Sequence, residues 1–600
     1  MKRRWKVLCW IAGVLIVLAT ALIVAIALFD WNRLKPLVND KVSQAIGRPF
    51  QIKGDLGVAW RREAGEGGWH GLVPWPEFTA EDIYIANPAW AKLPFLVHLD
   101  ALRFRLSPLP LIAHRILIPS VQLVHPQADL ERDAQGRATW DLALAPSDGP
   151  STWNLDLREI GFDRGQVSVD DAASKIQLQV AIEPLQQAIP YDQLVAQESS
   201  DARDQAGRSA GAAARKALSA QEQPAAAATA AAPPAGRPAI GNYVFAWQAQ
   251  GNYKGTPLHG TGRTGATLAL QETDRPFPVQ AKVQIGDSHI ALVGTFTDPV
   301  HLGALDLKLW FAGSSMAKLY PIIGVTLPDT PPYATEGHLK AELHRRGSRF
   351  SYENFKGRVG GSDLAGNLAF TTEGPRPKLS GQLKSQLLQF SDLAPLLGAD
   401  SNQEKQQRGD ATPQPANKAL PVEPFRTDRW KTMDADVAFS GARILRDKTL
   451  PINSLETHVY LDNGQLRLEP LRFGVAGGRI DSTLRLDGGQ VPMPGTIKLS
   501  ARHLKLKQLF PSFESMQTSF GEINGDAALS ARGNSVAALL GSADGELKLL
   551  MNDGAISRNL LETAGLNVGN VVLGKLFGDK TVEINCAASD FVGKNGRFDT

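Results

Sequence analysis

Three stretches of equal length, 288–324, 362–398 and 478–514, repeat one another without a gap. Each consists of two runs in which apolar and polar residues alternate, followed by a Leu-x-Pro motif. Alternation with a period of two is typical of strands that bury one face of a sheet. Internal repeats indicate a stacked structure whose neighbouring units share a core, rather than a single compact enzyme core. Chance similarity between β-rich stretches is the alternative explanation.

The alternating runs place apolar residues on one face and, in the second and third repeats, polar residues such as Asp363 and Arg479 on the other. A sheet with one apolar face must cover that face. Because helix signals are few, the sheet must curl on itself, meet a second sheet or hold an apolar ligand. We predict a curled sheet with an apolar groove. The residues predicted to line this groove are Ile290, Leu292, Phe296, Leu364, Leu368, Phe370, Leu383, Ile480, Leu484, Leu486 and Leu499.

The N-terminal segment is typical of a membrane anchor. An uncharged run from Val7 to Phe29 is long enough to cross a hydrocarbon core of about 30 Å as a helix. Four of the first six residues are Lys or Arg, which places the N-terminus in the cytoplasm and the bulk of the chain outside. A cleaved signal peptide is the alternative, since Ala19-Thr20-Ala21 has the small-x-small form, but the apolar run continues well beyond it.

The rest of the chain divides by composition into β-rich blocks and segments without strand pattern. Apolar residues at helical spacing after the anchor, with a stop at Gly47, predict a membrane-proximal amphipathic helix. Two segments rich in Ala, Gln, Pro and charge predict flexible insertions. The predicted organisation is a cytoplasmic tip and transmembrane helix at 1–29, the amphipathic helix at 30–49, a first β-rich block at 50–195, an Ala/Pro-rich insertion at 196–238, a second block with two repeats at 239–399, an insertion at 400–418 and a third block at 419–600.

Composition and motifs argue against several classes of function. The balance of 64 Lys and Arg against 61 Asp and Glu, intermixed along the chain, does not favour nucleic acid as a partner. The glycines of 260–265 match G-x-G-x-x-G, but a strand-like run follows them where a dinucleotide site needs a helix. The glycine motif at 569–575 lacks the Ser or Thr of a phosphate loop. We predict no catalytic residues, no metal site and no cofactor, and hence no enzyme.

An apolar trough suits acyl chains. Exposing a sixteen-carbon chain to water costs about 0.8 kcal/mol per methylene, or about 12 kcal/mol in all. A continuous apolar wall would make the transfer from membrane to protein nearly isoenergetic, so that movement along it meets only small barriers. This energetic argument favours a conduit over a catalyst.

Motifs near both ends of the chain resemble one protein family. They are FDWNRLKP at 29–36, GRPF at 47–50 and GDL at 54–56, then PQADLER at 126–132 with Gly136 and Trp140, and near the end GEL at 545–547, DGAI at 553–556 and INCA at 584–587. In this order they are similar to the AsmA family.

The resemblance implies a single-pass inner-membrane protein of a Gram-negative bacterium with its bulk in the periplasm. It also implies kinship with TamB-like and chorein-type proteins, whose elongated β-grooves are thought to move phospholipid between membranes. The AsmA module usually continues with further strands beyond the position of Thr600, so we expect that the sequence is cut off or that this member lacks a distal tip.

The expected fold is therefore mainly β: a transmembrane helix followed by an elongated, curled antiparallel sheet, groove-like and built from repeats, with a few short helices. The expected function is conduction of phospholipid, or another acyl-chain lipid, between the inner and outer membranes. The alternative is a scaffold or assembly factor that binds outer-membrane or other envelope proteins or regulates envelope composition. The two differ in whether the apolar groove stays open or is filled by the protein's own side chains.

Overall fold

The computed structural model shows a chain that consists mainly of β-strands. Among the residues that the structure describes, twenty-eight strands belong to one large mixed sheet that is not closed, and two more form a small second sheet. The chain forms two compact units: Met1–Val195, Ala235–Gly286 and Val293–Gly303 make the first, and Ala196–Pro234, Asp287–Leu292 and Ala304–Thr600 the second. The structure describes residues 10, 29–61, 75–107, 111, 114–142, 154–219, 240–265, 268–269, 276–297, 304–343, 347–409, 412–445, 452–509, 520–557 and 581–599.

The strands of the first unit pair mostly as antiparallel neighbours, with two parallel pairs, β5–β7 and β6–β8. They are β1 (Phe50–Ile52), β2 (Leu56–Arg61), β3 (Trp75–Ala86), β4 (Phe95–Arg105), β5 (Arg115–Val124), β6 (Gln127–Arg132), β7 (Asn154–Phe162), β8 (Gly165–Asp171), β9 (Ile176–Ile189), β10 (Tyr243–Tyr253), β11 (Thr256–Gly265), β12 (Leu268–Ala269) and β13 (Phe277–Ile285). β14 (Ser288–Phe296) lies where the chain passes between the units.

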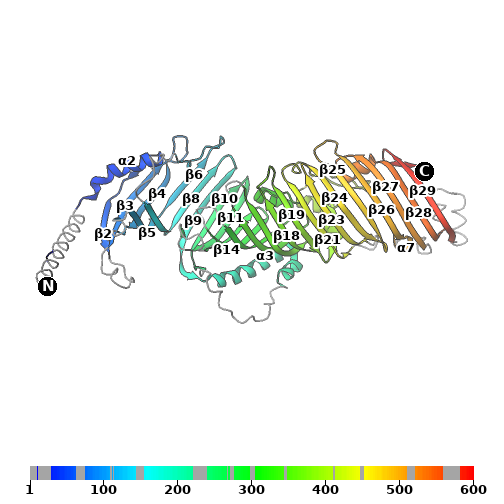
Figure 1. The fold of residues 1–600 in the computed structure, drawn as a ribbon, viewed down its shortest axis with the longest axis horizontal. Helices are drawn as coiled ribbons and strands as arrows, with labels where there is room; N and C mark the ends of the chain where they lie inside the picture. Colours follow the sequence, from blue (N-terminus) through cyan, green and yellow to red (C-terminus); the bar gives the residue numbers. More distant parts are fainter. Residues whose placement is uncertain are drawn as a thin grey trace, which may run out of the picture. The chain divides into compact units, whose positions relative to one another are not determined.

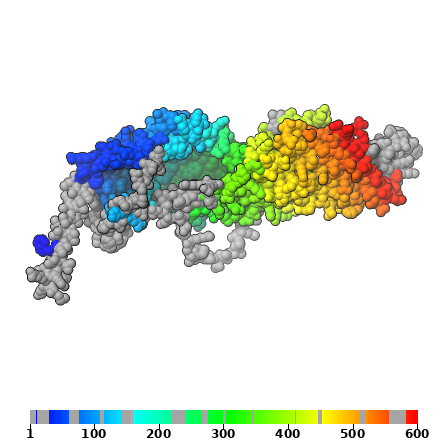
Figure 2. Space-filling view, turned by 45° about the horizontal axis from the view of Figure 1, so that its top comes forward, coloured from blue at the N-terminus to red at the C-terminus, as the bar shows by residue number. Residues whose placement is uncertain are grey.

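The strands of the second unit add to the sheet in sequence order, as Figure 1 shows for the labelled strands from β18 to β29. The surface in Figure 2 accordingly changes colour in chain order, from green through yellow to red. The strands are β15 (Ala304–Gly313), β16 (Tyr333–Glu342), β17 (Arg349–Val359), β18 (Ser362–Thr371), β19 (Lys378–Ser385), β21 (Asp434–Gly441), β23 (Ile452–Asp462), β24 (Gln465–Val475), β25 (Gly478–Asp487), β26 (Pro494–Lys505), β27 (Phe520–Arg532), β28 (Asp544–Ser557), β29 (Thr581–Lys594) and β30 (Arg597–Asp599), and the small sheet pairs β20 (Leu388–Gln389) with β22 (Ile444–Leu445).

Each of the three repeats forms two strands and a short helical turn, as predicted. The turns are η4 (Met316–Leu319) with α4 (Tyr320–Ile323), η5 (Phe390–Leu393) with α5 (Ala394–Leu397), and α7 (Leu506–Leu509). In the first two repeats the proline of Leu-x-Pro lies in the first turn of the helix, where a missing N–H breaks no hydrogen bond. Gly324 and Gly398 end these helices with φ of 74° and 67°, a conformation that glycine adopts without strain. Pro511 of the third motif lies outside the described residues.

The helix predicted within 30–49 packs against β1 at one edge of the sheet. It consists of η1 (Trp31–Leu34) and α2 (Lys35–Ile46), and it ends at Gly47 as predicted. The Asn39 side chain accepts a hydrogen bond from the Ile52 backbone N–H at 3.0 Å, and the Ser43 hydroxyl accepts one from the Phe50 N–H at 2.8 Å. These side chains occupy backbone donors that an exposed edge strand would otherwise offer to another chain. The helix therefore blocks strand addition at β1.

The predicted membrane span at 7–29 falls, except for Trp10 and Phe29, outside the described residues. Among the residues that the structure does describe, no helix is both long enough and apolar enough to span a membrane.

The structure differs from the predicted insertions. A helix, α3 (Tyr191–Ser219), with a kink at Ala210 and Gly211, occupies the start of the segment 196–238. Alanine has the highest helix propensity, and α3 buries Leu194, Ala202 and other small apolar residues at intervals of four and eight. The segment 400–418 contains α6 (Asn402–Arg408), which the Ser401–Glu404 capping box begins. Neither segment separates the two units.

The sheet is mixed, although an antiparallel sheet was predicted. In the second unit β19 and β21 run parallel, as do β20 and β22. Alternation along a strand specifies which residues share a face, but it carries no information about the direction of the neighbouring strand. The connection from β19 to β21 returns the chain to the opposite end of the sheet, so that β21 enters in the same direction as β19.

Candidate site: an apolar row across the second unit

One face of the second unit carries a row of apolar residues that crosses its strands, with a glycine in place of a side chain on β19 and β28. Residues that pair directly across neighbouring strands point to the same face, so a chain of register partners defines a row. From β15 to β28 the successive partners are Leu307, Leu339, Tyr352, Leu368, Gly381, Val437, Val459, Leu468, Leu484, Ile497, Leu529 and Gly545. We call these residues the central row. Its one polar group, the Tyr352 hydroxyl, donates a hydrogen bond to the Leu309 carbonyl at 3.3 Å.

The adjacent row, displaced by one residue, is polar and faces the other way. Its successive partners from β16 to β28 are Lys340, Ser351, Ala369, Ser380, Asp436, Tyr460, Arg467, Arg485, Thr496, Ser530 and Asp544. The His458 side chain at 2.8 Å and the Lys378 ammonium at 3.2 Å hold the pKa of Asp436 below its usual range. The second unit is therefore a two-faced sheet, with charge and hydroxyl groups on one side and aliphatic groups on the other.

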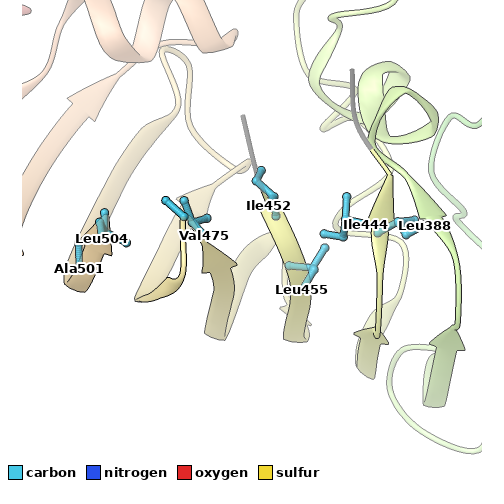
Figure 3. Packing of buried hydrophobic residues seen from close by; sticks show 8 residues of the cluster. Leu388, Ile444, Ile452, Leu455, Val475, Ala501 and Leu504 are labelled. Atoms are coloured by element: carbon cyan, nitrogen blue, oxygen red, sulfur yellow. The ribbon is translucent and has the colours of Figure 1, made fainter. Parts of the chain in front are cut away.

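A cluster of buried side chains covers the apolar face at one end of the strands. This is the end at which the helical turns follow β15, β19 and β26, and we call it the turn end. There Phe390 and Leu393 of η5 and Leu509 of α7 pack against strand residues that include Leu455 and Ala501. Figure 3 shows side chains of this cluster on neighbouring elements, from Leu388 and Ile444 across to Ala501 and Leu504.

A second cluster covers part of the apolar face toward the opposite end of the strands. Val325 and Leu327, which follow α4, and Met433, which precedes β21, pack on this face. Met433 is 1 % exposed and Val325 is 7 % exposed. The strand residues beneath them are Leu368, Phe370, Leu379, Leu383 and Val437.

Beyond the second cluster, from β24 to β27, the central row is only partly shielded. Leu468, Leu484, Ile497 and Leu529 are half-buried, and neither cluster includes them. The helical turns stand on one side of this stretch and α9 (Val536–Gly541) on the other, where the Leu539 and Leu486 side chains both approach Gly495. Four aliphatic side chains in a row, flanked on both sides by packed residues, form an apolar surface on which a chain-like apolar ligand can lie.

The residues predicted to line a groove fall into four environments. Ile480 and Leu499 join the turn-end cluster, and Leu368, Phe370 and Leu383 lie under Val325 and Met433. Leu484 belongs to the central row, and Leu486 is buried beside it. Leu364, which pairs with Gly357, and Ile290, Leu292 and Phe296 of β14 are half-buried.

The repeats alone did not reveal the full row. Leu339, Val459, Leu468 and Leu529 lie on strands outside the three repeats, and the prediction did not include them. The same alternation, read in these strands, is the signal that could have found them. Among the described residues no group of three or more His, Cys, Asp or Glu side chains is placed to hold a metal ion.

Comparison with known proteins places the chain in a family. The model of the AsmA family matches residues 1–600. The chain is 43% identical over 610 residues to a protein of Escherichia coli (strain K12) described as "AsmA family protein YhjG", an alignment that covers 99% of this chain and 84% of that protein. No solved structure matches the chain. From the family match over its whole length and from this relative, the chain belongs to the AsmA family.

Proposed function

We propose that the second unit binds acyl chains along its central row and that the protein conducts phospholipid between the inner and outer membranes of a Gram-negative envelope. Membership of the AsmA family suggests a function connected with the cell envelope. The observation that supports lipid binding in particular is the half-buried stretch of the central row formed by Leu468, Leu484, Ile497 and Leu529.

The chemistry of this stretch supports a lipid rather than a polar ligand. Its side chains offer no hydrogen-bonding groups, so an acyl chain can lie on it without leaving a buried polar atom unpaired. From β24 to β27 each strand contributes one aliphatic side chain to the row, and a ligand that moves by one strand within this stretch meets a similar surface. Movement along the row then needs no large change in buried apolar area and hence meets low barriers.

Site-specific photo-crosslinking in growing cells tests the proposal. A photoreactive amino acid at Leu484 faces the central row, and one at the neighbouring Thr483 faces the polar side of the same strand. We expect phospholipid adducts of the full chain at Leu484 and few or none at Thr483, detected by mass spectrometry of the purified protein. Recovery of protein adducts alone at both positions would contradict lipid binding.

A scaffold that assembles envelope proteins is the second candidate. The packed clusters at the turn end and under Val325 favour it, because there the apolar face is filled by the protein's own side chains. This candidate predicts a stable protein partner, which the crosslinks at Leu484 and Thr483 would reveal in place of lipid. The half-buried central stretch favours lipid conduction over this candidate.

A further inference from the structure

The connection from β19 to β21 crosses the apolar face of the second unit. Because these two strands are parallel, the chain must travel from the turn end, at Ser385, to the opposite end, at Asp434. On the way Phe390 and Leu393 pack into the turn-end cluster and Met433 packs on the strand residues of the second cluster. Both clusters lie on the apolar face, so the connection bridges this face and does not pass behind the sheet.

A second segment, 324–331, meets this connection over the same face. The Thr326 backbone N–H lies 3.1 Å from the Met433 sulfur, and the hydroxyl oxygens of Thr326 and Thr432 are 3.4 Å apart. At the turn end, the Thr330 N–H donates to the Ser315 hydroxyl at 3.1 Å. We call residues 324–331, 398–409 and 412–433 together the strap.

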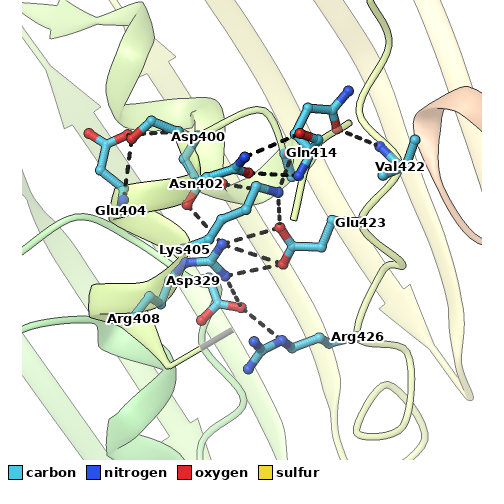
Figure 4. A network of polar contacts seen from close by, with 12 residues as sticks. Asp329, Asp400, Asn402, Glu404, Lys405, Arg408, Gln414, Val422, Glu423 and Arg426 are labelled. Atoms are coloured by element: carbon cyan, nitrogen blue, oxygen red, sulfur yellow. Dashed lines mark hydrogen bonds and ion pairs between the residues drawn. The ribbon is translucent and has the colours of Figure 1, made fainter. Parts of the chain in front are cut away.

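Buried ion pairs fasten the two parts of the strap to each other (Figure 4). The Arg408 guanidinium of α6 lies 2.8 Å from Asp400, 3.2 Å from Glu423 and 3.5 Å from Asp329. The Lys405 ammonium, 1 % exposed, donates to the Gly398 carbonyl at 2.7 Å and contacts Glu423. With Arg426 at 3.3 Å from Asp329, three acidic side chains face three basic ones.

This balance of charge favours a structural clamp over an anion site. Each basic side chain contacts a carboxylate, and the carboxylates of Asp400 and Glu423 are themselves buried. A lipid phosphate would have to displace one of these carboxylates to reach Arg408 or Lys405. Removing one partner of a buried pair leaves an uncompensated charge, which is strongly unfavourable. The ion pairs therefore hold the two parts of the strap together at Asp329. The strap touches the central row only through apolar side chains such as Val325 and Leu327.

The strap interrupts the central row at the level of β18 to β21. Val325 and Met433 pack on Leu368 and Val437, two members of the row, whereas Leu339 on one side and Leu484 on the other belong to neither cluster. Resting on the proposed function, we propose that the strap is a gate. A lipid chain passes between the β15–β17 stretch and the β23–β28 stretch of the row only when Val325 and Leu327 lift from the sheet.

An engineered disulfide that can be reduced tests the gate. Thr326→Cys with Thr432→Cys, in a chain with Cys9→Ser and Cys586→Ser, joins the two parts of the strap where their hydroxyl oxygens are 3.4 Å apart. Ser348→Cys with Thr372→Cys, at neighbouring positions of the β17–β18 hairpin, is the matched disulfide away from the strap. Photoreactive residues at Leu339 and Leu484 report lipid on the two stretches, in oxidised and in reduced protein.

With the disulfide between positions 326 and 432 oxidised, we expect lipid labelling to fall at least tenfold at one of the two photoreactive positions and to remain unchanged at the other. Reduction of the disulfide should restore the lost labelling. The hairpin disulfide should change neither. Equal labelling of locked and reduced protein at both positions would overturn the gate while leaving lipid binding in place. Absence of lipid at both positions in reduced protein would instead refute the proposed function and the gate with it.

A loosened strap supplies the complementary measurement. Val325→Ala removes two methyl groups from the contact with the row, which should raise labelling at the limiting position roughly tenfold. Thr326→Ser keeps the backbone contact to Met433 and serves as the control. A Val325→Ala protein with unchanged labelling, and with the same resistance to protease as the parent, would contradict the gate.

Discussion

A negative charge at the centre of the apolar row should block lipid, whereas the same charge on the opposite face should not. Leu484 pairs with Leu468 and Ile497 in the central row, and its neighbour Thr483 faces the polar side opposite Lys498. We therefore compare Leu484→Asp with Thr483→Asp. The two variants carry the same added charge on the same strand and differ in the face that bears the carboxylate.

The size of the effect follows from the apolar area that a lipid chain can no longer bury against the row. An ionised carboxylate keeps its water, so a lipid chain that passes Leu484→Asp must withdraw methylenes from the wall. Withdrawing two methylenes costs about 1.6 kcal/mol, which corresponds to a roughly fifteenfold lower occupancy. Because Leu484 is not fully buried, the variant should lose about 2 kcal/mol of folding free energy and remain folded.

Lipid adducts at a photoreactive residue in place of Leu529, two strands along the row, measure this occupancy. We expect the adduct yield to fall roughly fifteenfold in Leu484→Asp and to stay within about twofold of the parent in Thr483→Asp. Thermal unfolding of both purified variants distinguishes a defect in binding from a defect in folding. Equal yields in the two variants would refute the assignment of the lipid path to the apolar face.

Three further predictions concern folding. Lys405→Met should destabilise the second unit by about 1–3 kcal/mol in chemical denaturation, because it removes one of the two cationic partners of the buried Glu423 and leaves only Arg408, and adding Glu423→Leu should recover most of the loss. Asn39→Ala should cost about 1–2 kcal/mol by leaving an edge-strand N–H unpaired, which faster hydrogen exchange of β1 would report. The hydrogen bond from Arg132 lowers the pKa of Asp171 to about 2, so its stabilisation is present above pH ~4, the unfolded value, and is lost as the pH falls toward 2; Arg132→Leu should move acid unfolding of the first unit to higher pH.

Residue alternation predicted the local structure well because it depends only on neighbours along the chain. The two strands and the turn of each repeat formed where Leu-x-Pro and the alternating runs indicated them. The helix over 35–46 likewise ended at Gly47. Each of these features is set by a residue's own backbone preference and by which side of its strand it occupies.

The tertiary arrangement could not be predicted in the same way. Nothing in the residues of β19 or β21 specifies that they run parallel, and the strap exists only because they do. Lys405 and Arg408 lie in a segment whose composition indicates a flexible insertion, yet they form ion pairs with Glu423 and Asp329 outside it. Arg426 also pairs with Asp329. Burial against the sheet overrides that composition, since a charged segment can fold when each charge meets a partner.

The apolar face of the second unit is packed by other side chains at some levels and not at others, which distinguishes a lipid conduit from a hydrophobic core that serves only folding. A sheet that needed its apolar face only for stability would pack side chains over every level of it, as Met433 and Leu504 do in the two clusters. Leu468, Leu484, Ile497 and Leu529 instead are half-buried and belong to neither cluster. Full burial of an aliphatic side chain contributes about 1.5–3 kcal/mol, so the exposed part of each of the four forgoes at most about 1 kcal/mol. A bound acyl chain would recover this free energy and would release it again as the chain moves on, which is what a binding site for passage requires and a folding core does not.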